Sequence, residues 1–120
     1  MRPEFETVIT IKPGYFKKKI GIRFDMLCFF CMLEEFDIEL GEDISSISKI
    51  PYDEMLTVAI YTGMQSYCFE HKKIMRYDKL TVLKWMEDSV ITRGHFKALG
   101  SLWNDFMSDS TDKKKAKANH

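Results

Sequence analysis

The sequence predicts an α+β fold that is mainly α: an N-terminal β-hairpin, about four helices and a disordered C-terminal tail. Alternating β-branched residues flank a Pro-Gly turn near the N-terminus, and apolar residues then recur at helical spacing as far as residue 107. No apolar anchor follows that point. We therefore expect one globular domain over 1–108, with the hairpin in 5–24, helices in 25–108 and a flexible basic tail in 109–120.

The hairpin is predicted from two runs of residues joined by Lys12-Pro-Gly14. The first run, Phe5 to Ile11, is rich in β-branched residues. The second ends in strict alternation, which places Ile20, Ile22 and Phe24 on one face. Because two strands are not stable alone, we expect one face to pack on helices or on another copy's strands.

The first helix, residues 25–36, opens with an N-cap candidate, Asp25, and then eight consecutive apolar residues, 26–33. A surface helix shows a single apolar stripe, so this one must be covered by its own domain or by a partner chain. Eight methionines and nine phenylalanines support either an adaptable binding surface or simply a large core. The residues that we expect to contact a partner are Met26, Phe29, Phe30 and Met32 on this helix, with Tyr15 and Phe16 at the hairpin edge.

Three further helices are expected after a connector, residues 38–50, that touches the core at Leu40, Ile44 and Ile47. The second helix spans Pro51 to about His71, and its central Gly63 indicates a close approach by another helix. The third opens at Asp78 and the fourth near Thr92. Their expected inward residues are Leu80, Leu83 and Trp85 or Met86 in the third helix, and Phe96, Leu99, Leu102, Trp103 and Phe106 in the fourth.

The charges sum to zero but are separated along the chain. Residues 12–23 carry five bases and no acid, whereas residues 34–54 carry eight acids and one base. These two stretches either pair between copies or form two solvated faces. The last eight residues contain four lysines and no acid, so the rest of the chain has a net negative charge. A net negative charge disfavours nucleic-acid binding.

No pattern of catalytic, metal-binding or cofactor-binding residues is present, so we predict that the protein is not an enzyme. Cys28 and Cys31 lie in an apolar helix, which favours buried free thiols over zinc or redox chemistry. The three histidines lie far apart in the sequence. There is neither a secretory signal nor an apolar stretch of ~20 residues, so we expect a soluble intracellular protein without a membrane span.

The order of the predicted secondary-structure elements resembles that of one known protein family. A hairpin runs directly into Ile22-Arg-Phe-Asp-Met-Leu-Cys-Phe-Phe-Cys-Met-Leu-Glu-Glu-Phe-Asp-Ile38, followed by Leu56-Thr-Val-Ala-Ile-Tyr-Thr-Gly-Met64 and Val82-Leu-Lys-Trp-Met-Glu-Asp88. Over about residues 6–107 the chain resembles the tail assembly chaperones of long-tailed bacteriophages and prophages. It departs from their usual pattern at residues 28–31, Cys-Phe-Phe-Cys, where charged residues often interleave.

The resemblance implies a small helical protein, working as a homo-oligomer, that coats the apolar tape measure protein and helps recruit tail tube subunits. It implies action in the cytoplasm of the bacterial host, absence from the mature virion and no cofactor. The alternative is a small phage or mobile-element regulatory protein that binds a host protein or nucleic acid. Lys113-Lys-Lys115 is either a site of ribosomal frameshifting to a longer product or a solubilising basic tail.

Overall fold

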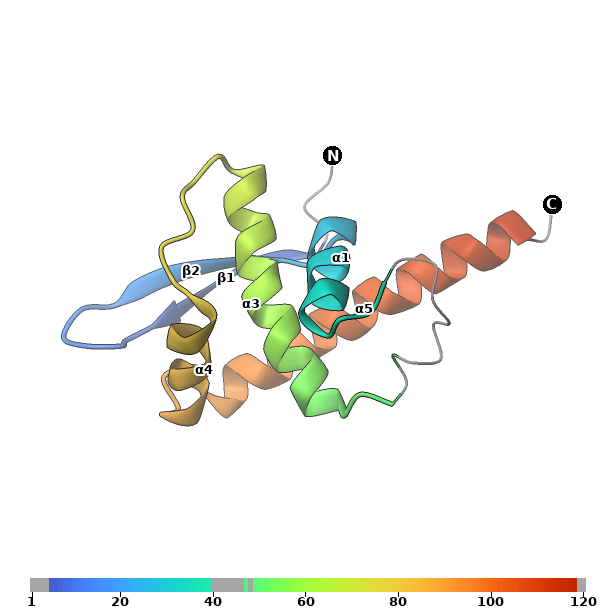
Figure 1. Cartoon of the computed structure of the whole chain (residues 1–120). Helices are drawn as coiled ribbons and strands as arrows, with labels where there is room; N and C mark the ends of the chain where they lie inside the picture. Colours follow the sequence, from blue (N-terminus) through green and yellow to red (C-terminus); the bar gives the residue numbers. More distant parts are fainter. Residues whose placement is uncertain (1–4, 40–46, 48, 119–120) are drawn as a thin grey trace.

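The structure, a computed structural model, describes residues 5–39, 47 and 49–118, with side chains as far as residue 109. Within this part of the chain, an antiparallel hairpin of β1 (Glu6–Ile11) and β2 (Lys18–Arg23) precedes four helices. The helices are α1 (Met26–Glu35), α3 (Tyr52–Glu70), α4 (Lys79–Glu87) and α5 (Arg93–Ala118). Helix α3 crosses the hairpin between α1 and α4, and α5 passes obliquely behind α3 in Figure 1. The predicted α+β, mainly helical architecture is confirmed.

The hairpin supplies one wall of the core. Ile9 pairs with Ile20 across the two strands, and both side chains are buried. The predicted alternation holds, since Ile22 and Phe24 are also buried. The Phe24 ring meets Trp103 of α5 edge to face at a centroid distance of 5.2 Å. The hairpin is therefore stabilised by helices of its own chain, as a two-stranded sheet requires.

Two glycines allow α3 to lie close against β2. A Cβ atom at Gly21 would overlap the ring of Tyr67, and one at Gly63 would lie 2.8 Å from Cγ2 of Ile22. The close approach that the sequence predicts at Gly63 is present, but its partner is strand β2 and the adjoining Phe24 rather than another helix.

Helix α4 turns inward only part of the face that the sequence predicts: Trp85 is buried as expected, but Leu80 is not. Leu80 is 76% exposed, whereas Val82 and Trp85 are buried. The helix begins where predicted, since the Asp78 carboxylate accepts from the Thr81 backbone N–H. Packing of Val82 and Trp85 in the core decides which face turns inward, and it leaves Leu80 outside. The expected inward role of Leu80 was wrong.

Helix α5 extends into the predicted tail. Its backbone is helical through Ala118, within the segment 109–120 for which flexibility stays a prediction, and residues 119–120 lie outside the described residues. Figure 1 shows these last turns extending beyond the other elements. In the connector, Ile47 packs half-buried on the core, while Leu40 and Ile44 lie outside the described residues.

The glycine contact yields a test. Gly21→Ala should lower the free energy of unfolding by about 1–3 kcal/mol, because the new methyl group must displace the Tyr67 ring. Gly14→Ala is the matched control, since a Cβ there meets nothing within 4 Å. Urea unfolding of both variants measures the difference. Equal stabilities would show that the ring moves aside at no cost.

Candidate client-binding surfaces

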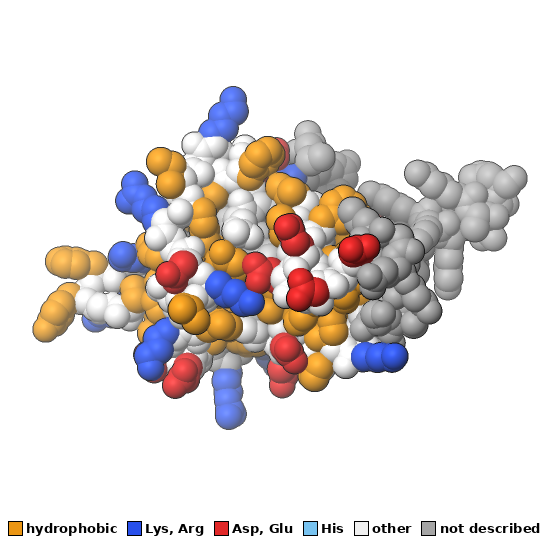
Figure 2. Space-filling view, in the orientation of Figure 1, with side chains coloured by type: hydrophobic (Ala, Val, Ile, Leu, Met, Phe, Trp, Pro, Cys, Tyr) orange, Lys and Arg blue, Asp and Glu red, His pale blue; other side chains and the backbone are white. Residues whose placement is uncertain are grey.

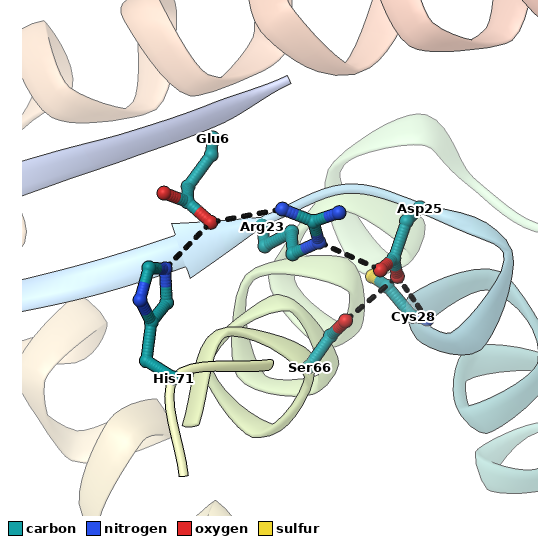
Figure 3. A network of polar contacts seen from close by, with 6 residues as sticks. All are labelled: Glu6, Arg23, Asp25, Cys28, Ser66 and His71. Carbon is teal, nitrogen blue, oxygen red and sulfur yellow. Dashed lines mark hydrogen bonds and ion pairs between the residues drawn. The ribbon is translucent and has the colours of Figure 1, made fainter. Parts of the chain in front are cut away.

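A single carboxylate fixes the start of α1. Asp25 Oδ1 accepts from the Cys28 backbone N–H at 2.9 Å and from the Ser66 hydroxyl at 2.7 Å. Its other oxygen, Oδ2, accepts from Arg23 Nε at 2.9 Å. Figure 3 shows these contacts converging from β2, α1 and α3. The predicted cap at Asp25 is confirmed, and it also ties the helix to two other elements.

Arg23 extends this network to the hairpin's first strand. Its side chain is only 7% exposed, and its terminal nitrogen donates to Glu6 Oε1 at 3.0 Å. The same oxygen lies 2.9 Å from Nε2 of His71, the C-cap residue of α3 (Figure 3). Burial would raise the pKa of Glu6, but its hydrogen bonds to His71 and Arg23 outweigh burial and hold that pKa below its ordinary value.

This anchoring divides the apolar run of α1 into two faces. Cys28, Met32 and Leu33 are buried, and the Cys28 sulfur lies 3.3 Å from the Thr62 hydroxyl of α3. Met26, Leu27 and Phe30 remain 49%, 39% and 39% exposed. Because Phe30 lies four residues after Met26 and three after Leu27, the three side chains adjoin one another on the helix surface. We call these three residues the outer face of α1.

The structure separates the six predicted contact residues into three groups. Met26 and Phe30 belong to the outer face, and Phe29 is half-buried beside it, with its ring 6.4 Å from that of Phe30. Met32 has no exposed surface, so its assignment as a contact residue is corrected: it faces inward, in the core.

Tyr15 and Phe16 form the third group, in the loop between β1 and β2, and are 94% and 81% exposed. The loop projects at the left of Figure 1, away from α1, and carries exposed hydrophobic side chains in Figure 2. The predicted contact residues that remain exposed thus lie on two separate surfaces, whereas the sequence groups them as one set. Other large apolar side chains, among them Phe69, Ile74 and Leu80, are also exposed elsewhere on the described residues.

Leu27 is the contact candidate that the sequence analysis missed. Its spacing to Phe30 was the available signal, because residues three apart lie on one side of a helix. Sequence spacing did not say which side of an apolar helix would face α3. That choice is made by the Asp25 contacts described above.

The thiols of the described residues have little nucleophilic character. Burial raises the pKa of Cys28 to about 12, with a smaller opposing contribution from its hydrogen bond to Thr62. Burial likewise raises the pKa of Cys31 and of Cys68. All three cysteines are free thiols and stay protonated at neutral pH, which is unfavourable for nucleophilic catalysis.

Two further features are absent from the described residues. No group of His, Cys, Asp and Glu side chains there is arranged to hold a metal ion. No described helix is both long and apolar enough to cross a membrane. Comparisons with models of protein families, with curated proteins and with solved structures found no match.

Removing the carboxylate at the centre of the network should be costly. Asp25→Ala should lower the free energy of unfolding by about 2–4 kcal/mol, because a helix cap is lost and buried Arg23 loses a partner. Asp78→Ala is the matched control, since it removes a cap hydrogen bond at an exposed helix start. Chemical denaturation should show the smaller loss for Asp78→Ala; equal losses would contradict the central role of Asp25.

The lowered pKa of Glu6 predicts a pH dependence. The ionised Glu6 carboxylate stabilises the fold at pH values above its ordinary pKa of 4.5. This contribution is lost as the pH falls through the lower pKa that Glu6 has in the folded state. Glu6→Gln should therefore be less stable than the wild type at pH 7, and the gap should close on acidification below pH 4.5. Denaturation at several pH values measures this gap, with exposed Glu39→Gln as control. A gap independent of pH would contradict the assignment.

Proposed function

We propose that this protein is a non-catalytic tail assembly chaperone of a long-tailed phage or prophage, which binds the apolar tape measure protein and helps recruit tail tube subunits. The observation that carries the proposal is the outer face of α1. Three large apolar side chains are exposed side by side on a helix whose orientation is fixed by buried polar contacts.

The outer face suits a client that is recognised by its apolar character. Burying it gains roughly 25 cal/mol per Å² of apolar surface. The flexible thioether of Met26 and the ring of Phe30 adapt to different neighbouring side chains. Each contact is weak, so a long client is held by many copies along its length. The exposed acids Glu34 and Glu35, at the end of the same helix, favour solubility of the coated client.

The second apolar surface supports the recruiting part of the proposal. Tyr15 and Phe16 lie at the hairpin tip, away from the outer face of α1 (Figure 1). A chain with two separate apolar surfaces is able to hold one partner while contacting another. We assign the outer face of α1 to the tape measure protein and the hairpin tip to the tail tube subunit.

Co-expression with the tape measure protein tests this assignment. Leu27→Glu with Phe30→Glu should leave the client in the pellet, because charged side chains cannot be buried against an apolar segment. Both positions are partly exposed, and thermal unfolding of the double variant checks that it is folded before the client is assayed. Leu80→Glu on α4 is the matched control, and it should solubilise the client as the wild type does. A fully active double variant would contradict the proposal.

The alternative, a small phage or mobile-element regulatory protein that binds a host protein or nucleic acid, is distinguished by gene order. A chaperone gene should lie between a tail tube gene and a very long tape measure gene. An isolated early gene would favour the regulatory function. The same nucleotide sequence tests the frameshift hypothesis, because Lys113 to Lys115 must then be encoded within a slippery heptamer.

A further inference from the structure

Four basic side chains line a groove on the α4 side of α3. The groove has a volume of about 620 Å³ and lies between β2 and the link that joins α3 to α4. No aspartate or glutamate is among the described residues that line it. Ile20, Met64 and Met75 contribute an apolar floor. Its bases are Lys19, Lys72, Lys73 and Arg76, and we call it the cationic groove.

These positive charges are not neutralised within the described part of the chain. None of the four makes an ion pair with a described residue. Lys73 lies over the Tyr67 ring at 5.6 Å, and neighbouring Lys18 lies over Tyr77 at 5.5 Å. Cation–π contacts position the ammonium groups but leave their charge in place. They also occupy ring faces on which bases would otherwise stack, which argues against single-stranded nucleic acid as the occupant.

The opposite charge is concentrated at the end of α1. Residues 34–39 contain four acids and no base, and all four acids are exposed. Glu35 pairs with Lys79 at 2.8 Å, but the other three make no ion pair with a described residue. Figure 2 shows acidic side chains gathered over the middle of the face in view. We call Glu34, Glu35, Asp37 and Glu39 the acidic end of α1.

We propose that the cationic groove of one copy receives the acidic end of α1 of a second copy. Within one copy the acidic end of α1 reaches the start of α4 through the Glu35–Lys79 pair, whereas none of its acids makes an ion pair with a base of the cationic groove. The groove offers four bases, and three of the four acids at the end of α1 make no ion pair with a described residue. The chain as a whole has 18 bases and 18 acids, so two copies carry no net charge that would drive them apart. The inference does not depend on the identity of the client.

Charge-reversal variants test the proposal by sedimentation velocity. The wild type should self-associate at about 20 mM salt and dissociate at about 500 mM, where exposed charges are screened. Lys72→Glu with Lys73→Glu, and separately Glu34→Lys with Asp37→Lys, should each raise the dissociation constant by about tenfold or more. Arg93→Glu with Lys97→Glu is the matched control: it makes the same change of charge at exposed positions of α5 and should associate as the wild type does.

Mixing the two weakened variants is the decisive step. Each retains the surface that the other lacks, so the mixture should regain a complex that contains both. All four substituted positions are exposed, so each variant should fold. Thermal unfolding of each variant checks this. A wild type that stays monomeric at low salt, or a mixture no tighter than its components, would overturn the proposal. The proposal would also be overturned if the Lys72→Glu, Lys73→Glu variant lost binding to a labelled oligothymidine but self-associated as the wild type does.

Discussion

The structure depends on the Asp25 carboxylate more than on any other group. It accepts hydrogen bonds from a backbone N–H of α1, from Ser66 of α3 and from Arg23 of β2. Burying the Arg23 guanidinium would be unfavourable without Asp25 and Glu6, because a buried charge must be paired. The hairpin, α1 and α3 therefore hold a fixed relation to one another, and Phe24 is placed against Trp103 of α5.

The functional proposal follows from this constraint. An apolar run of eight residues could be buried in several ways. The cap selects the one in which Cys28 and Met32 pack inward and Leu27 and Phe30 remain outside. The exposed residues are held on a rigid helix, so binding a client does not require ordering them first. The same helix ends in acids that face water, which places an apolar surface and a charged one within one short element.

The sequence was sufficient to predict the strands and helices because the signals for them are local. These signals are the Pro-Gly turn, the caps at Asp25 and Asp78, and the alternation along the strands. It was insufficient where tertiary contacts decide. It predicted Leu80 inward and Met32 at the surface, and the packing of α4 and α1 on α3 reversed both. It did not pair residues 72–76 with Lys19, because only the fold brings these basic segments to one groove.

The most direct test of the account is photo-crosslinking from single positions during co-expression with the tape measure protein. A benzoylphenylalanine is placed at position 30 on α1 or, for comparison, at position 80 on α4; both native side chains are exposed. The account predicts that position 30 forms adducts with the client and that position 80 does not. Adducts from position 80 alone, or equal adducts from both, would contradict the assignment of the outer face of α1 as the client-binding surface.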